Sequence, residues 1–316
     1  KPPGRGFTWL WKCWKLLRKL KPDVCHTRNL GALEAQLAGF LSGVSYRIHG
    51  EHGWDVGDIG GKNVKYQNLR KLFRPLVHQY VALSIEARDY LLEKIAVPSD
   101  RINRICNGVD VEIFTPGSSN PFHEFTLNDG DVVFGTVGRL ASVKNQTFLV
   151  NAFVELVKDK VPESNKLKLI IVGDGSLMPE LVDIVEKNGL SSQVYLAGQR
   201  SDVADCLKAF NVFILPSLAE GISNTLLEAM ATGLPFIATD VGGNGDLIYP
   251  PHADSHLIPV NNIDKLVSVM KQYANNPCLI NEHSGLVHQH CVENFSIENM
   301  VGKYHQLYQS AKTKGI

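Results

Sequence analysis

Residues 214–243 have the sequence ILPSLAEGISNTLLEAMATGLPFIATDVGG, and this stretch decides the fold class. An apolar strand ends at Ser217, and Ser223 is a typical N-cap for the helix that follows. Gly233 ends that helix, and a second apolar strand occupies residues 235–240. Strand, helix and strand in this order predict a βαβ unit with two parallel strands.

The same alternation continues on both sides of this unit. Further strands are predicted at 23–27, 44–49, 79–84, 101–108, 132–138, 168–173 and 194–198, and helices at 9–20, 30–42, 62–77, 85–95, 145–158, 176–187, 201–209, 263–275 and 296–312. Residues 115–131 are rich in Pro, Gly, Ser and Asn, which is typical of a linker. We therefore predict two Rossmann-like, doubly wound parallel-sheet α/β domains. They cover residues 1–125 and 129–295, and the helix at 296–316 returns to the first domain.

The charge is distributed unevenly along the 316 residues, although the formal net charge is zero. Residues 1–110 carry 18 Lys/Arg against 10 Asp/Glu, and residues 111–316 carry 14 against 22. A basic half can face an anionic surface, and residues 9–20 (WLWKCWKLLRKL) mix Trp with Lys. The sequence thus suggests peripheral contact with an anionic membrane, and no nucleic-acid partner is expected. A solvated surface with ion pairs between domains is the open alternative.

The cysteines and the hydrophobic content indicate the compartment. The six cysteines are scattered, without the spacing of metal ligands. They are typical of small buried residues in a reducing environment. No run of about 18 apolar residues is present. We therefore expect a cytoplasmic protein, peripheral at most to the inner face of the membrane.

Two carboxylates flank the start of the helix at 224–232. Glu220 lies in the preceding loop and Glu228 lies about one turn into the helix. Between them, the backbone N–H groups at the start of a helix attract phosphate. The residues that carry these groups are Gly221, Ile222, Ser223 and Asn224.

A second loop adds positive charge. The strand within FGTVGRLASVKN (134–145) ends at Gly138, and Arg139 and Lys144 follow. A guanidinium and an ammonium group at the end of a strand suit a diphosphate. Taken singly, each of these side chains is also explained as a solvated surface cation.

Together these segments resemble glycosyltransferase family 4 over nearly the whole chain. The G-R-x-x-x-x-K loop is matched at Gly138, Arg139 and Lys144, and the E-x7-E motif at Glu220 and Glu228. The resemblance implies the GT-B fold, in which two domains face a cleft. It also implies transfer of a sugar, with retention and without metal or cofactor, from a UDP- or GDP-linked donor to a glycan or lipid-linked acceptor.

The resemblance also implies roles for single residues. Arg139 and Lys144 would bind the donor diphosphate and neutralise the leaving group. Glu228 would hold the ribose hydroxyls, and Glu220 would contact the transferred sugar. The backbone from Gly198 to Arg200 would meet the nucleobase.

In the N-terminal half, RIHGEHGWD (47–55) follows a predicted strand. By the family pattern His52 is the better candidate for the active site and His49 is its companion. His49 and Glu51 are the candidates for the acceptor side. A purely structural role of these histidines stays open. The sequence of this segment resembles the sequences of sugar transferases from exopolysaccharide and exosortase-associated loci.

The start of the chain departs from the family pattern. Family members begin with a strand and a glycine-rich loop, whereas Lys1 leads into the helix at 9–20. We expect a shortened N-terminus, and whether this chain alone turns over is left open. The segment Asp129-Gly130-Asp131 mimics a metal-binding D-x-D motif, but its place in the linker favours a turn.

Two alternatives to a transferase remain. One is an epimerase of nucleotide sugars with the same architecture, and the other is a non-catalytic nucleotide-sugar binder. The combination of Arg139, Lys144, Glu220 and Glu228 favours transfer.

Overall fold

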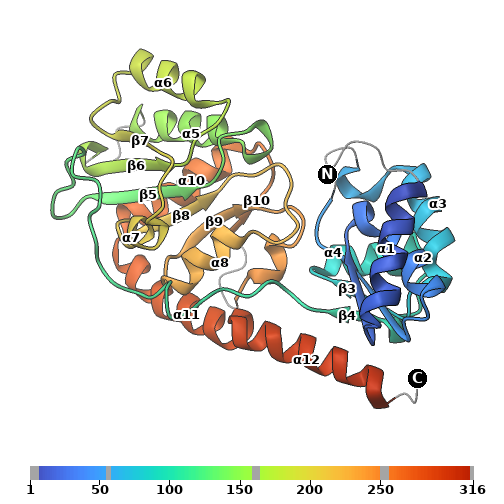
Figure 1. Cartoon of the computed structure of the whole chain (residues 1–316). Coiled ribbons are helices and arrows are strands. Elements are labelled where there is room, and N and C mark those ends of the chain that lie inside the picture. The colour runs from blue at the N-terminus through green and yellow to red at the C-terminus, as the bar shows by residue number, and fades with distance from the viewer. Residues whose placement is uncertain (1–6, 55–57, 159–163, 250–255, 314–316) are drawn as a thin grey trace. The chain divides into compact units, whose positions relative to one another are not determined.

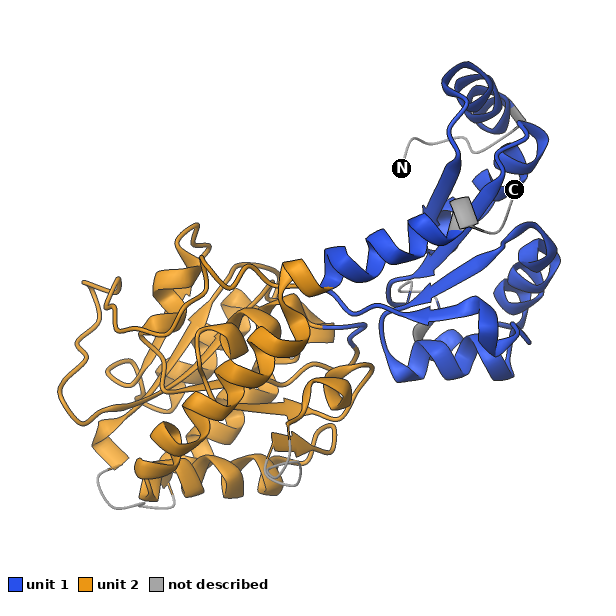
Figure 2. Ribbon diagram, turned by 90° about the horizontal axis from the view of Figure 1, so that it is seen from below, with its two compact units in different colours: residues 1–107, 220–222, 300–316 blue, residues 108–219, 223–299 orange. Residues whose placement is uncertain are grey.

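The chain forms two compact units in a computed structural model (Figures 1 and 2). The residues that the structure describes are 7–54, 58–158, 164–249 and 256–313. Unit 1 comprises residues 1–107, 220–222 and 300–316, and unit 2 comprises residues 108–219 and 223–299.

Unit 1 is built on a parallel sheet with the strand order β1-β2-β3-β4 among the described residues. Its strands are β1 (Val24–Arg28), β2 (Tyr46–Glu51), β3 (Gln79–Ala82) and β4 (Ile102–Arg104). Its helices are α1 (Phe7–Leu20), α2 (Ala35–Leu41), α3 (Val64–Phe73) and α4 (Ile85–Glu93), with short 3-10 turns η1 (Leu30–Ala32), η2 (Ile59–Gly61), η3 (Arg74–Leu76) and η4 (Ser99–Arg101). Every residue of β2 and β3 is buried, as expected for a parallel sheet.

The last helix, α12 (Ile297–Thr313), completes the core of unit 1. Leu307 packs in a cluster with Tyr46, Ile48 and Val81. The Tyr46 hydroxyl also lies 3.0 Å from the Ser310 Oγ. Figure 2 therefore colours residues 300–316 with the sheet of unit 1, although they lie nearly 200 residues after its last strand.

Unit 2 contains a parallel sheet with the strand order β10-β9-β8-β5-β6-β7, counted over the described residues. Its strands are β5 (Val132–Val137), β6 (Leu167–Val172), β7 (Val194–Gly198), β8 (Val212–Leu215), β9 (Phe236–Thr239) and β10 (Leu257–Ile258). Its helices are α5 (Gln146–Lys158), α6 (Met178–Lys187), α7 (Val203–Lys208), α8 (Asn224–Ala231), α10 (Ile263–Asn275) and α11 (Cys278–Phe295), with 3-10 turns η5 (Ser142–Lys144), η6 (Ser164–Lys166) and η7 (Asn244–Leu247).

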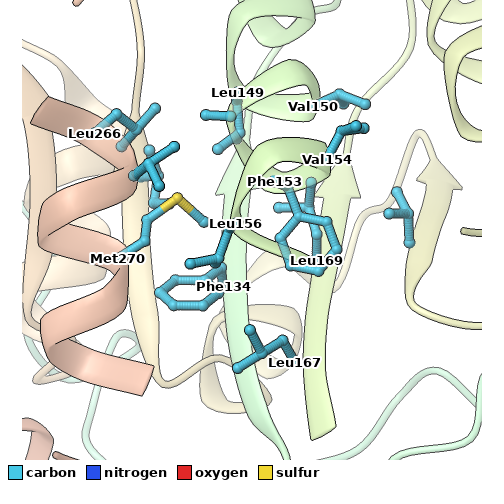
Figure 3. Close-up of a cluster of buried hydrophobic side chains, with 14 of the residues drawn as sticks. Phe134, Leu149, Val150, Phe153, Val154, Leu156, Leu167, Leu169, Leu266 and Met270 are labelled. Atoms are coloured by element: carbon cyan, nitrogen blue, oxygen red, sulfur yellow. The ribbon is translucent and has the colours of Figure 1, made fainter. Parts of the chain in front are cut away.

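The strand order of unit 2 reverses at β5, which pairs with both β6 and β8. Ligands of open α/β sheets bind at the carboxyl ends of the strands beside such a switch point. On one face of the sheet, Phe134 of β5 packs against α5 and α10 through residues such as Phe153 and Met270 (Figure 3). Helix α8 contacts β8 and β9, and α11 packs on α8.

The prediction of two parallel-sheet α/β domains is confirmed by these two sheets. Residues 108–125, which the sequence analysis assigns to the N-terminal domain, lie in unit 2. Phe122 and Phe125 are buried, and both contact the Tyr195 ring, with ring centroids 5.8 and 5.2 Å away. The Pro- and Gly-rich segment is therefore packed onto unit 2 by its aromatic side chains.

Candidate functional site

The loops that follow β5, β6 and β7 are tied together at the carboxyl edge of the sheet in unit 2. Gly138 N donates to Val172 O at 2.9 Å, and Gly173 N donates to Gly198 O at 2.8 Å. A β-carbon on Gly173 would overlap the Gly138 carbonyl oxygen, so this close approach requires glycine. Gly138 and Gly198, both predicted as donor-site residues, therefore lie at the same edge.

The two predicted cations lie on the loop after β5. Arg139 is exposed and Lys144 is half-buried. The Arg139 carbonyl accepts a hydrogen bond from Gln146 Nε2 at 3.1 Å. Val143 O accepts from Leu218 N at 2.8 Å, which ties the cationic loop to the loop that leads into α8. The structure thus brings the Gly-Arg-Lys loop beside the segment that precedes the E-x7-E helix.

The start of α8 is fixed from two sides. Ser223 is 2% exposed, and its hydroxyl accepts a hydrogen bond from Leu226 N at 3.3 Å, so the predicted N-cap is confirmed. The Thr239 hydroxyl, at the end of β9, donates to Ser217 O at 2.5 Å. Both contacts hold the loop whose backbone N–H groups begin α8. Asn224, the first residue of the helix, is exposed.

Glu228 is a half-buried carboxylate inside α8. Among the described residues no hydrogen bond or ion pair to its carboxylate is found. Burial raises the pKa of Glu228 from 4.5 to about 7. A carboxylate in this state is available to accept hydrogen bonds from the hydroxyl groups of a ligand.

Arg200, expected near a nucleobase, is held by other groups of unit 2. Its guanidinium donates to both carboxylate oxygens of Asp202, at 2.8 and 2.6 Å, and to Pro121 O at 3.3 Å. It also lies over the Phe122 ring, 5.6 Å from the centroid. These bonds engage the Arg200 guanidinium within unit 2. The remaining donor-site candidates, Glu220, Gly221 and Ile222, belong to unit 1.

In unit 1, His49 lies in a buried polar chain at the end of β2. Its Nδ1 is 2.7 Å from the Thr27 hydroxyl, which also accepts a hydrogen bond from Gln36 Nε2 at 2.6 Å. His49 Nε2 lies 3.5 Å from Glu51 Oε1. Because His49 is fully buried, its position supports the structural alternative that the sequence left open.

Glu51 is the centre of a buried ion network. Arg70 donates to its two carboxylate oxygens at 2.6 and 3.2 Å and to Asp58 at 3.1 Å. Burial alone would raise the pKa of Glu51, but the neighbouring His49 and Arg70 outweigh it and lower this pKa to about 2. Glu51 is therefore a charged anchor, with 2% of its surface exposed.

His52 is half-buried just after β2, and Asn29 Oδ1 accepts a hydrogen bond from its backbone N–H at 2.8 Å. Burial, followed by the charge of Arg28, lowers the pKa of His52 to about 4. The imidazole is therefore neutral at neutral pH. Of the three candidates in RIHGEHGWD, His52 is the one outside the buried network.

Sequence reasoning did not select Arg70, Asp58, His26 or Arg28. The alternation of strands and helices places His26 and Arg28 at a strand end, which is a usable signal. No comparable signal exists for Arg70, because it meets Glu51 only through the packing of α3 on the sheet.

Comparisons with known proteins place the chain in a family. Glycosyltransferase Family 4 matches residues 1–113, and Glycosyl transferases group 1 matches residues 131–276. A UDP-Gal:alpha-D-GlcNAc-diphosphoundecaprenol alpha-1,3-galactosyltransferase of Escherichia coli is 32% identical over 93% of this chain and 77% of its own length. The chain belongs to glycosyltransferase family 4.

Other similarities agree with this family 4 assignment. A poly(ribitol-phosphate) alpha-N-acetylglucosaminyltransferase of Staphylococcus aureus is 26% identical over 65% of this chain and 41% of its own length. The crystal structure of Anabaena Alr3699/HepE with UDP superposes with a TM-score of 0.80, at 17% identity, over 97% of this chain and 82% of that one. The GT-B fold is thus confirmed.

The family 4 chain is therefore a glycosyltransferase, of the kind that makes polysaccharides and glycoconjugates. The comparisons do not favour the epimerase or the non-catalytic binder. Within the part of the chain that the structure covers, no helix has both the length and the apolar character needed to cross a bilayer. The Asp129-Gly130-Asp131 segment is a turn, in which Asp131 Oδ2 accepts from Asn128 N at 2.8 Å.

The raised pKa of Glu228 predicts a pH-dependent stability for this family 4 enzyme without its donor. The folded-state pKa of Glu228 is raised from 4.5 to about 7. The protein is therefore most stable to unfolding when this carboxyl group is protonated, and it loses stability as the pH rises through this range. We expect Glu228→Gln to melt about 2–4 °C above the parent at pH 8, the scale of about 1 kcal/mol in a domain of this size. At pH 4.5 the two should melt together, and scanning calorimetry at both pH values measures the difference. A higher Tm of the parent at pH 8 would contradict the assignment of an unpaired buried carboxylate.

Proposed function

We propose that this chain transfers a sugar, with retention of its anomeric configuration, from a nucleotide-diphosphate sugar to a glycan or lipid-linked acceptor. The observation that carries the proposal is the junction of two loops in unit 2. The Val143–Leu218 hydrogen bond joins the loop of Arg139 and Lys144 to the loop that begins α8. This bond supports a site in which cations and helix N–H groups act together at the switch point of the sheet.

The negative charge of the leaving group explains why the proposed donor site needs cations and helix N–H groups. A departing nucleotide diphosphate builds negative charge, while the anomeric carbon becomes positive. Arg139, Lys144 and the backbone N–H groups of Ser223 and Asn224 neutralise the diphosphate without metal. Preorganised donors of this kind often supply the largest catalytic term.

The other candidates orient the donor. Glu228 accepts hydrogen bonds from the ribose hydroxyls, and Glu220 contacts the transferred sugar. The backbone from Gly198 to Arg200 meets the nucleobase. In a retaining transfer the acceptor attacks on the face of the leaving group, so neither carboxylate acts as a conventional nucleophile.

The comparisons support a UDP-linked donor and an acceptor that carries phosphate. The Escherichia coli relative is named for UDP-Gal and for a diphosphoundecaprenol acceptor. The Staphylococcus aureus relative is named for poly(ribitol-phosphate), and the Anabaena structure contains UDP. A GDP-linked donor is the alternative.

The test is a transfer assay with a panel of UDP- and GDP-sugars and a synthetic GlcNAc-diphosphate lipid as acceptor. Mass spectrometry detects the product, and the proton coupling at the new anomeric centre gives its configuration. An inverted product would overturn retention. Release of a free epimerised sugar would identify an epimerase, and donor binding without transfer to any acceptor would identify a binder.

We further propose peripheral membrane contact through α1. This helix carries Lys12, Lys15, Arg18 and Lys19 and no acidic residue in its first turn. Trp11, Leu16 and Leu20 are 46%, 55% and 63% exposed. An amphipathic, basic helix with Trp and Leu on its surface suits an anionic bilayer.

Vesicle sedimentation tests this contact. The chain is expected to bind vesicles of anionic lipid at low salt more tightly than neutral vesicles, because each basic residue near the surface contributes about 1 kcal/mol. Salt should weaken this binding by screening. Changing Lys12, Lys15 and Lys19 together to Gln should remove most of it, whereas the same change at Lys265 of α10 should not. Equal binding to neutral and anionic vesicles would exclude the proposal.

A further inference from the structure

Unit 1 has a cluster of basic and titratable side chains that the proposed donor chemistry leaves unused. His26 and Arg28 lie two residues apart on β1, so both point to the same face of the sheet. Arg28 is the exposed last residue of the strand. His52 follows the neighbouring strand β2, which pairs with β1 in parallel. The three side chains therefore gather at one carboxyl edge.

The imidazole rings of His26 and His52 both lie close to the backbone of Gly50. A β-carbon at Gly50 would lie 3.4 Å from His26 Nε2 and would overlap the His52 ring. Among the described residues neither Nε2 atom has a hydrogen-bond partner. A buried ring nitrogen without a partner is costly, and such costs concentrate at functional sites.

Tyr308 of α12 orients His26. Its hydroxyl lies 2.8 Å from His26 Nδ1. When this hydroxyl donates to Nδ1, the imidazole proton resides on Nε2. His26 then presents an N–H group on the side that faces His52 and Gly50.

The charge state of both histidines depends on Arg28. Burial and then the Arg28 charge lower the pKa of His26 and of His52 to about 4. The other titratable groups that face them are His49, Glu51, Tyr304 and Tyr308. An anion paired with Arg28 would remove the repulsion that the guanidinium exerts on the imidazoles. Each imidazole could then take up a proton and add to the attraction.

We infer that Arg28, backed by His26 and His52, binds a phosphate group of the acceptor substrate. This inference rests on the proposed function, which assigns the donor diphosphate to the loops of unit 2 and requires an acceptor that carries phosphate. An arginine at the rim fits a phosphate ester because its planar donors match two phosphate oxygens. The imidazoles behind it provide charge only when the anion is present.

The test measures inorganic pyrophosphate binding by titration calorimetry. The parent for this test is the full chain with Arg139→Ala and Lys144→Ala, which removes the two proposed cations of the donor site in unit 2. Adding Arg28→Ala should weaken this affinity about 10- to 100-fold, the usual effect of losing hydrogen bonds to a charged group. Arg88→Ala, an exposed arginine of α4 in the same unit, is the matched control and should leave it unchanged. An affinity within twofold of the parent after Arg28→Ala, or no binding by the parent, would overturn the inference.

Two further arms complete the test. N-acetylglucosamine 1-phosphate and farnesyl diphosphate, compared with pyrophosphate, distinguish a sugar phosphate from a lipid diphosphate as the source of the group. Sulfate itself does not titrate between pH 5 and 7, so any protons taken up when it binds must go to the protein. We expect such proton uptake in the parent. Changing His26 and His52 to Gln should abolish that uptake, and uptake that persists would exclude the histidines. Because these are equilibrium measurements, they stay informative if sugar transfer itself is not found.

Discussion

Arg139→Ala and Lys144→Ala are each expected to lower turnover about 10²–10³-fold. Both residues lie on the loop after β5, where the Val143–Leu218 hydrogen bond holds them beside the start of α8. Their positive charge matters most when the diphosphate departs, because the negative charge on the diphosphate is larger in the transition state than in the bound donor. The loss should therefore appear in kcat more than in the KM for the donor. Initial rates with a saturating UDP-sugar and the full chain measure it.

The matched control is Lys265→Ala, which removes an exposed lysine of α10 in the same unit. Its turnover should stay within about twofold of the parent. Glu228→Ala should show the opposite pattern to Arg139→Ala, with weaker donor binding as the main effect. If both loop variants keep turnover within about threefold of the parent, the diphosphate lies elsewhere.

Arg70→Met is expected to destabilise unit 1 by about 3–5 kcal/mol. The change removes the only cation that the structure shows within bonding distance of both Glu51 and Asp58 among the described residues. Two carboxylates with 3% and 1% side-chain exposure would then be left without their guanidinium. Hydrogen exchange of the β2 amides and scanning calorimetry report the effect on this unit.

The pH dependence of this variant follows from Glu51. Because its folded-state pKa is lowered from 4.5 to about 2, the stability from the ion network is present above pH 4.5 and is lost as the pH falls towards 2. The difference between Arg70→Met and the parent should therefore shrink below pH 4.5. Arg88→Met, on the surface of α4, should change stability by less than about 0.5 kcal/mol. A similarly small effect of Arg70→Met at pH 7 would show that the network is not a stabilising element.

The strands of both sheets, except the two-residue strand β10, could be predicted from the sequence because they are short apolar runs between turn residues. The predicted strand at 194–198 coincides with β7, and Ser223 caps α8 as expected. The predicted helix at 62–77 ends earlier, at Phe73, because Pro75 lacks the N–H group that continues an α-helix. These features depend on neighbouring residues alone.

Helix α11 and the ion network of unit 1 could not be predicted in this way. The buried stripe of α11 is His283, Val287, Cys291 and Phe295, and its first member, His283, is of a type that does not mark a hydrophobic face. Arg70 meets Glu51 across 19 residues of sequence. Both features are decided by tertiary packing. For the same reason the sequence does not reveal that Glu51, predicted for the acceptor side, is a buried carboxylate paired with Arg70.

The path of the chain through its two units has a consequence for the order of events on the ribosome. Unit 2 is complete at residue 299, whereas the core of unit 1 includes Leu307 of the last helix. Domains fold as units during synthesis. Unit 2 can thus reach its native state first. The sheet of unit 1, although it is synthesised earlier, has part of its core uncovered until α12 is added. The emergence of Leu307, and not that of β4, completes the core of unit 1.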